Sequence, residues 1–171
     1  MQLPVHASGS VELVIDRSEH QLQVKKSGSV LRTFKVAFGS GGRKGKLREG
    51  DRRTPLGTYY ISSVRTSDRF YFFLQLNYPN VEDAERGLKA DLISQKEYRR
   101  IVDAHLKGRM PPQHTALGGN IGIHGIGQET QHKRDIQELF DWTKGCIAMR
   151  NDEVEELNRF INVGTKVSIV K

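Results

Sequence analysis

Short runs of alternating apolar and polar residues, separated by turns rich in glycine and serine, constrain this fold more than any other feature. Such runs occupy residues 11–15, 20–24, 30–38, 58–64 and 165–170, and a glycine-rich buried strand is expected at 117–123. A period of two is typical of strands with one buried face, and the tight turns between the first runs indicate an antiparallel meander. The sequence therefore predicts a mainly β domain.

Helical spacing interrupts this β pattern in four places. The expected helices cover 81–92, 94–106, 130–142 and 152–162. Ser94 and Glu97 form a capping box, and Asn151 is the expected N-cap of the last helix. The first two helices would form an insertion at about residues 82–109 within a single domain of residues 11–171, preceded by a tail at 1–10.

The charge of the chain favours an anionic partner. Its 171 residues include 27 Lys and Arg against 20 Asp and Glu, a net charge of +7. Nucleic acid, acidic polymers and lipid headgroups are all attracted to such a surface. The sequence contains no helix-turn-helix, zinc finger or aromatic RNA platform, so nucleic acid is not the expected partner.

The sequence shows neither the apolar run of a transmembrane segment nor the pattern of a signal peptide. No run approaches the roughly 20 apolar residues that span a bilayer, so a transmembrane protein is not expected. Residues 1–10 have neither a basic region nor an apolar core of the kind found in signal peptides. This pattern predicts a cytosolic protein or a mature chain whose leader has been removed.

A glycine-rich basic loop occupies residues 39–53, with the sequence G-S-G-G-R-K-G-K-L-R-E-G-D-R-R. A phosphate-binding loop of the nucleotide-binding type needs a terminal Lys-Ser/Thr pair and a following helix. Here Thr54 and Pro55 lead into a strand instead. The loop is therefore not expected to bind phosphate in that way.

The single cysteine, Cys146, follows His124 by 22 residues. A thiol becomes a good nucleophile when a nearby base or cation favours its thiolate. Gly145 would let backbone N–H groups face a reacting carbonyl, as in an oxyanion hole. On these residues alone an inert buried thiol is the commoner alternative, and a lone histidine is also more often structural. Scattered histidines and one cysteine give no paired spacing for a metal site.

Several motifs together resemble one family. They are His124-Gly125, the segment T-K-G-C-I at 143–147, Asn151, the element T-P-L-G-T-Y-Y-I at 54–61 and the pattern L-x3-I-x2-G-x2-V-x-I at 157–169. This set resembles the YkuD-type L,D-transpeptidase catalytic domain of bacterial cell-wall enzymes, from about residue 11 to the C-terminus. The resemblance implies a β-sandwich-like fold with inserted and C-terminal short helices, and a location in the cell envelope or periplasm.

The chain departs from the family pattern in a few places. Lys144 stands where many members have histidine, and Ala148 stands where many have arginine. Arg150 is the nearest candidate to supply the missing cation. Residues 128–142 lengthen the gap between histidine and cysteine, and the 77–117 segment is also additional.

The resemblance implies a cysteine mechanism without metal or organic cofactor. The Cys146 thiolate would attack the carbonyl between the third residue and the terminal D-Ala of a peptidoglycan stem peptide. His124 would take the thiol proton and later protonate the leaving amine or activate the acceptor. The carbonyl of Gly125 would orient the imidazole, and the amides of Lys144, Gly145 and Cys146 would hold the oxyanion.

Substrate contacts are expected from residues around these two side chains. Cations would suit the carboxylates of the substrate, and aromatic or amide side chains would line the cleft. The candidates are Thr143, Arg150, Asn120, Tyr78 and Trp142, with Lys144 as a further cation. Surface charges and core aromatics are the alternative interpretations. The helical insertion is expected to form a lid or wall over the cleft.

The expected activity has several forms. A thioester acyl-enzyme passed to an amine gives transpeptidation, and the same intermediate passed to water gives L,D-carboxypeptidase activity. An amidase that releases a peptidoglycan-linked protein would use the same chemistry. A non-catalytic peptidoglycan-binding module is less expected because both the cysteine and the histidine are present.

Overall fold

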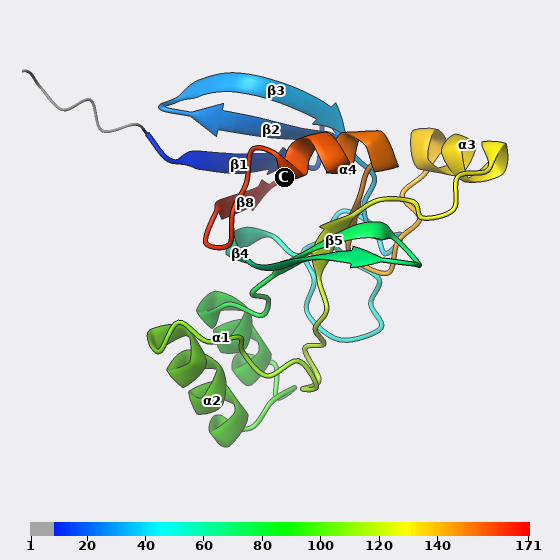
Figure 1. Cartoon of the computed structure of the whole chain (residues 1–171). Coiled ribbons are helices and arrows are strands. Elements are labelled where there is room, and N and C mark those ends of the chain that lie inside the picture. The colour runs from blue at the N-terminus through cyan, green and yellow to red at the C-terminus, as the bar shows by residue number, and fades with distance from the viewer. Residues whose placement is uncertain (1–8) are drawn as a thin grey trace, which may run out of the picture.

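The computed structural model describes residues 9–171, in which eight strands form one mixed sheet accompanied by four short helices (Figure 1). The strands are β1 (Val11–Asp16), β2 (Gln21–Lys26), β3 (Ser29–Lys35), β4 (Gly57–Ser67), β5 (Tyr71–Leu76), β6 (Gly122–His124), β7 (Ile147–Ala148) and β8 (Lys166–Val170). The helices are α1 (Val81–Lys89), α2 (Gln95–Leu106), α3 (Gln131–Leu139) and α4 (Asn151–Asn158). The strand order is β3-β2-β1-β8-β4-β5-β6-β7. The mainly β prediction is confirmed.

The N-terminal meander and the last strand follow directly from the alternating pattern. Leu13 and Ile15 of β1 are fully buried, as are Leu22 and Val24 of β2. β1 pairs antiparallel with β2 and parallel with β8, so the first and last strands of the domain lie side by side. This parallel pairing joins the two ends of the described chain into one sheet.

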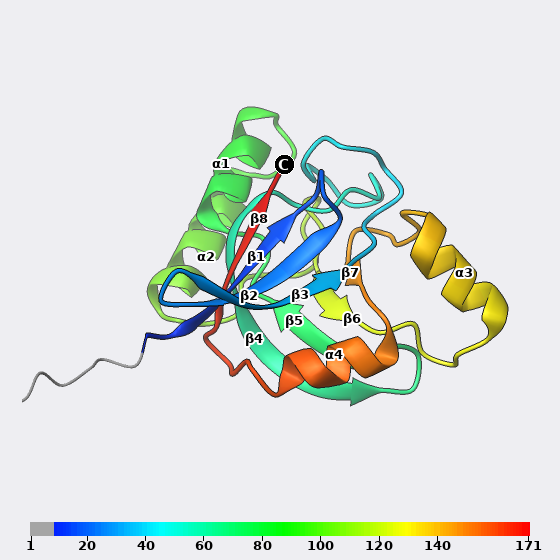
Figure 2. The same cartoon turned by 90° about the horizontal axis from the view of Figure 1, so that it is seen from above.

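The sheet folds over so that its two outer strands meet. The backbone groups of Ala37, just after β3, exchange two 2.8 Å hydrogen bonds with Ala148 of β7. Seen from above, β1, β2 and β8 pass over β4 and β5 (Figure 2). One main core fills the space between these halves and contains side chains from all eight strands. The arrangement agrees with the expected β-sandwich-like fold.

Three strand predictions need correction. β5 was not expected, because adjacent residues Phe73 and Leu74 are both buried and the strand therefore shows no clean alternation. The strand expected at 117–123 begins only at Gly122, and the one expected at 30–38 ends at Lys35. In both cases the apolar run continues into buried irregular backbone.

The expected helical insertion consists of α1 and α2, which stand together below the sheet (Figure 1). Asn80 and Ser94 cap these helices through capping boxes. A small separate cluster of Ala84, Ile93, Ile101 and Leu117 forms their core. The side chain of α1's Asp83 accepts a 2.7 Å hydrogen bond from the hydroxyl of Tyr59, which ties the insertion to β4.

The other two helices are shorter than predicted. The helix expected at 130–142 ends at Leu139 because Phe140 is extended. The helix expected at 152–162 is α4, and its N-cap residue is Arg150 rather than Asn151. Most of the expected tail at 1–10 lies outside the described residues. Within 9–171, no helix has both the length and the apolar character needed to cross a membrane.

Candidate active site

His124 is the last residue of β6, and Cys146 immediately precedes β7, the parallel neighbour of β6. β6 and β7 pair with Ile123 opposite Ile147 and His124 opposite Ala148. Side chains alternate between the two faces of a sheet, and partners across a ladder share a face. Cys146 stands two residues before Ala148, so its side chain lies on the same face as that of His124. The backbone amide of Gly122 acts on the pKa of the sulfur, which agrees with this register.

The Cys146 thiol is partly exposed and neutral in this environment. Its Sγ donates to the backbone carbonyl of Asn120 at 3.4 Å. Burial raises the pKa of the thiol to about 11, while the Gly122 amide and the positive charge of Lys46 lower it in part. The resting side chain at neutral pH is therefore the thiol rather than the thiolate.

His124 is held in one orientation within an aromatic environment. Its side chain is 2% exposed, and its Nδ1 lies 2.7 Å from the carbonyl oxygen of Gly125. A carbonyl can only accept, so Nδ1 carries the proton and Nε2 is left with a free lone pair. The rings of Phe70, Phe73 and Trp142 lie with centroids 4.1, 6.1 and 6.0 Å from the imidazole.

This environment sets the charge state of His124. Burial lowers the pKa of the imidazole to about 4, the Gly125 carbonyl opposes that shift, and the nearby charge of Arg69 adds to it. At neutral pH the imidazole is uncharged and can accept a proton. Cys146 and His124 are thus a neutral thiol and a neutral imidazole at rest.

Asn151 fastens the turn that follows His124, a role that the sequence did not reveal. Its Oδ1 accepts hydrogen bonds from the amides of Ile126 (2.9 Å) and Gly127 (3.2 Å). Its Nδ2 donates to the carbonyl of Gly127 at 2.6 Å. The side chain therefore binds the loop instead of capping α4, which explains why the N-cap prediction was wrong.

The loop before Cys146 is organised by Thr143. The hydroxyl of this buried residue donates to the carbonyl of Cys146 at 2.7 Å and accepts from the amide of Gly145 at 3.1 Å. The hydroxyl of Thr143 is therefore engaged within the loop in the resting structure, and its contact with substrate stays a prediction. Gly145 has a φ of +137°, and a Cβ there would lie 2.8 Å from the carbonyl oxygen of Arg53. Only glycine fits this position without strain.

The same hydrogen bonds bear on the expected oxyanion hole. The amide of Gly145 donates to the Thr143 hydroxyl in the resting structure, and its role in the oxyanion hole stays a prediction. In residues 9–171, the amides of Lys144 and Cys146 have no hydrogen-bond acceptor. These two amides are the donors that remain.

The remaining predicted contacts divide into two groups. Asn120 and Trp142 are brought to the pair, since the Asn120 carbonyl contacts Sγ and the Trp142 ring meets the imidazole edge-on. Tyr78 is 1% exposed and donates to the carbonyl of Leu117 at 2.7 Å, so it belongs to the core and does not line a cleft.

The two predicted cations are exposed. Lys144 precedes the Gly145–Cys146 pair in the chain, and Arg150 lies 3.2 Å from Asp152 at the start of α4. A third cation, Lys46, was missed. It is 5% exposed, and its Nζ donates to Asp51 at 2.9 Å and to the carbonyl of Arg48 at 3.0 Å. Its only signal in the sequence is its place in the basic glycine-rich loop.

No three His, Cys, Asp or Glu side chains within the described part of the chain lie close enough together to hold a metal ion. The donors and acceptors around Cys146 are backbone amides, a carbonyl and an imidazole. The site is thus a thiol beside a neutral base on one face of a folded β sheet.

These features define a mainly β domain with a cysteine–histidine pair at the ends of two parallel strands. The family model of the YkuD L,D-transpeptidase catalytic domain matches residues 10–169. The chain therefore belongs to the YkuD family.

Solved structures with the same fold include several L,D-transpeptidases. The Xylanimonas cellulosilytica L,D-transpeptidase is 14% identical, with a TM-score of 0.56, over 99% of this chain and 65% of that one. The helical cell shape determining protein Pgp2 of Campylobacter jejuni is 18% identical, with a TM-score of 0.61, over 96% of this chain and 49% of that one. A Mycobacterium smegmatis L,D-transpeptidase is 15% identical, with a TM-score of 0.54, over 95% and 59%.

At these identities the likeness concerns the fold. The chain spans about half to two thirds of the length of these three proteins. A search of curated protein sequences found no significant match.

Proposed function

We propose that this protein is a cysteine-dependent acyltransferase that acts as an L,D-transpeptidase on peptidoglycan stem peptides in the cell envelope. The observation that carries the proposal is the placement of Cys146 and His124 on one face of the β6–β7 pair in a member of the YkuD family. The Nδ1 hydrogen bond to Gly125 supports it, because it leaves Nε2 as the base.

The first half-reaction forms a thioester. As Sγ of Cys146 attacks the carbonyl carbon that precedes the terminal D-Ala, His124 Nε2 takes the thiol proton. The Gly125 carbonyl then stabilises the imidazolium through the Nδ1 hydrogen bond. The amides of Lys144 and Cys146 hold the tetrahedral oxyanion. When the C–N bond breaks, the imidazolium returns its proton to the amine of the leaving D-Ala.

The second half-reaction transfers the acyl group. His124 removes a proton from the acceptor while the acceptor attacks the thioester carbonyl. As the C–S bond breaks, the imidazolium gives that proton to the leaving Cys146 sulfur, which restores the neutral pair. An amine acceptor gives a cross-link, and water gives a shortened stem peptide. Both products come from one acyl-enzyme, so the carboxypeptidase and amidase alternatives share every residue named above.

The exposed residues around the pair are the proposed substrate contacts. Asn120 and Trp142 adjoin the sulfur and the imidazole. Lys144 and Arg150 supply positive charge for the carboxylates of a stem peptide, and each is exposed at one end of the segment that carries Cys146. Positive charges next to the site attract a ligand that carries carboxylates and help to orient it.

The test uses disaccharide-tetrapeptide muropeptides and follows their masses. The wild-type protein is expected to release D-Ala and to form dimers, while Cys146→Ala is expected to release none. Intact-protein mass spectrometry should detect an acyl adduct on the wild-type protein only. Tripeptide monomers without dimers would identify a carboxypeptidase. Equal D-Ala release by Cys146→Ala would overturn the cysteine mechanism, and binding without turnover would indicate a non-catalytic module.

A further inference from the structure

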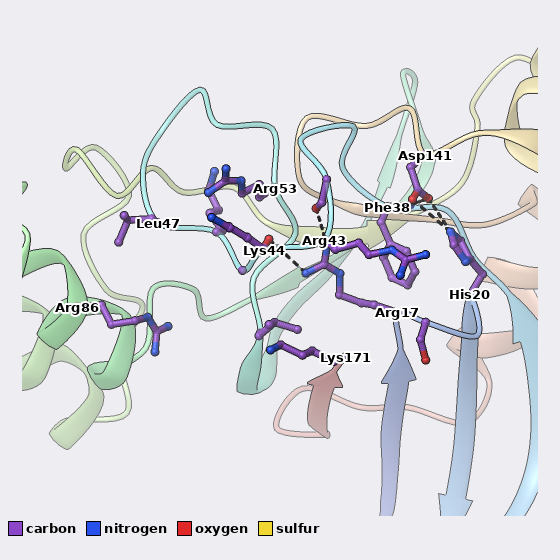
Figure 3. Close-up of a pocket in the computed structure, with 15 residues that line it drawn as sticks. Arg17, His20, Phe38, Arg43, Lys44, Leu47, Arg53, Arg86, Asp141 and Lys171 are labelled. Atoms are coloured by element: carbon purple, nitrogen blue, oxygen red, sulfur yellow. Dashed lines mark hydrogen bonds and ion pairs between the residues drawn. The ribbon is translucent and has the colours of Figure 1, made fainter.

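A basic cavity lies beside the thiol–imidazole site and is separate from it. It has a volume of about 810 Å³ and is enclosed by the end of β1, the loop at residues 39–56 and helix α1 (Figure 3). Neither Cys146 nor His124 lines it. The loop forms a partition, because Arg53 lines the cavity while its carbonyl oxygen faces Gly145 on the other side. A volume of this size is typical of sites that bind small molecules.

Positive charge dominates the wall of the cavity. The loop contributes Arg43, Lys44 and Arg53, which with Arg17 line the same space (Figure 3). Arg86 of α1 also lines it, but its guanidinium is paired with Asp83. Asp141 is the one acidic side chain in the lining, and it is already occupied. Its carboxylate lies 3.1 Å from Nε2 of His20 and accepts a hydrogen bond from the amide of Phe38.

Several of these cations lack an anionic partner. In the described residues, no carboxylate lies within ion-pair distance of Arg17, Arg43, Lys44 or Arg53. Like charges held around one cavity repel one another, and an anion that enters removes that repulsion. The cavity therefore favours a ligand with more than one negative charge.

Arg17 is fixed in place at this wall. Its guanidinium donates to the carbonyls of Gly42 (2.8 Å), Thr54 (3.3 Å) and Lys44 (3.4 Å) and lies over the ring of Phe38. Its Nε is the only buried side-chain nitrogen or oxygen of the described residues without a hydrogen-bond partner. A buried donor without an acceptor is unfavourable, so Arg17 keeps an unsatisfied donor at this wall.

Apolar side chains complete the lining. Phe38, Leu47 and Leu56 contribute apolar surface beside the cations. The ligand that fits this combination has charged groups on a body with an apolar face. This binding mode differs from a nucleotide-binding loop, because charged side chains rather than the start of a helix meet the anion.

We infer that this cavity is a binding site for a multivalent oxyanion, carried by phosphate or carboxylate groups. The inference goes beyond the proposed acyl transfer and does not depend on it. Guanidinium groups bind both kinds of oxyanion in a bidentate manner. A comparison of pyrophosphate with citrate distinguishes phosphate from carboxylate.

The experiment measures binding of pyrophosphate and citrate by calorimetry at constant ionic strength. Tighter binding of pyrophosphate identifies phosphate as the source, and tighter binding of citrate identifies carboxylate. The double variant Arg43→Glu/Lys44→Glu should weaken binding of the preferred anion by about tenfold or more. Both side chains are exposed, so the substitutions leave the core intact.

A matched control is Arg99→Glu/Arg100→Glu, which makes the same change in net charge on α2, outside the cavity. It should leave the affinity within about twofold of the wild-type value. Cys146→Ala should bind the anion like the wild-type protein, so a failure of the acyl-transfer proposal would not affect this one. The inference would be overturned if neither anion bound, or if both double variants lost the same share of the affinity.

Discussion

The neutral state of His124 arises from residues that surround it rather than from its own position in the chain. Phe70, Phe73 and Trp142 exclude water from the ring, and the Gly125 carbonyl fixes the proton on Nδ1. Exclusion of water disfavours the charged imidazolium, which is why the pKa falls to about 4. The base is thus available at neutral pH, and it becomes charged only during proton transfer.

The buried imidazole makes folding stability depend on pH. The pKa of His124 is about 4 in the folded protein against an ordinary value of 6.5. Between these values the unfolded chain binds the proton and the folded protein does not, so acid favours unfolding. The free energy of unfolding should fall by about 3 kcal/mol from this group as the pH drops from neutrality through 4.

Denaturant titrations at several pH values on the wild-type protein and His124→Gln check this prediction. The variant should lose that part of the pH dependence and keep the part due to carboxyl groups. Parallel pH curves for the two proteins would show that His124 is not the group responsible.

Cys146 should react slowly with alkylating reagents at neutral pH. Burial raises the pKa of its thiol to about 11, and only the thiolate is alkylated efficiently. The rate with iodoacetamide should therefore keep rising beyond about pH 9, where a cysteine with an ordinary pKa approaches its plateau. A short unstructured peptide containing cysteine is the reference. A plateau near neutral pH would mean that the resting thiol is ionised.

At the scale of elements, the side chain of Asn151 joins α4 to the turn that follows β6. Asn151 makes three hydrogen bonds to Ile126 and Gly127, in the turn that also contains the Gly125 carbonyl. The first residue of α4 therefore controls the orientation of a residue 27 positions earlier. We regard Asn151 as a positioning residue for His124.

Asn151→Ala tests this link. Loss of the side chain leaves two amides unpaired, which should destabilise the fold by about 1–3 kcal/mol. A displaced imidazole should lower kcat by about tenfold to a hundredfold with little change in KM. Asn158→Ala, in the same helix and without a side-chain hydrogen bond in the described structure, is the control. Equal effects of both variants would show a general role of α4.

The insertion of α1 and α2 reaches the site through the segment that follows it. Gln113 accepts from the amide of Asn120 at 2.8 Å and donates to the carbonyl of Tyr78 at 2.7 Å. The carbonyl of Asn120 in turn contacts the Cys146 sulfur. The expectation that the insertion forms a lid or wall stays a prediction, and this segment is the physical route by which it would act.

Replacing residues 82–109 by a short flexible linker tests the lid. The variant should show a higher KM and more hydrolysis relative to cross-linking, because the acyl-enzyme would be more open to water. Circular dichroism establishes that the sheet remains folded. Leu106→Ser changes an 82% exposed side chain of α2 and should alter neither quantity. An unchanged KM and product ratio in the linker variant would exclude the lid.

On the scale of the whole molecule, the two apolar clusters differ greatly in size. The main core spans the folded sheet, whereas the core of the insertion consists of four buried residues. Regions with little buried apolar surface open at lower free energy than the rest of a domain. The insertion should therefore be the first part of the described structure to open.

Native-state hydrogen exchange measures this difference. The amide of Ile101 in α2 should exchange through an opening of lower free energy than the amide of Val167 in β8. Low concentrations of denaturant should accelerate exchange of the first amide less steeply than of the second, because a sub-global opening exposes less surface than global unfolding. Equal opening free energies for both amides would show that the sheet and the insertion unfold together.

Some features were predictable because they depend on residues close together in the chain. Alternation placed β1, β2 and β8, helical spacing placed α1, and the Ser94–Glu97 capping box placed the start of α2. The His-Gly and T-K-G-C-I motifs identified the candidate pair and the family. Each of these signals spans fewer than about fifteen residues, which is the range over which local propensity acts.

The sequence alone thus determined the mainly β class and the two inserted helices, and it named the candidate pair Cys146 and His124. Only the tertiary structure decided that Tyr78 is core, that Thr143 occupies the Gly145 amide, and that the β3 and β7 edges meet. The basic cavity likewise needs β1, the 39–56 loop and α1 to come together. Burial and hydrogen-bond partners depend on segments far apart in the chain, and local patterns carry no information about which of those segments will pack together.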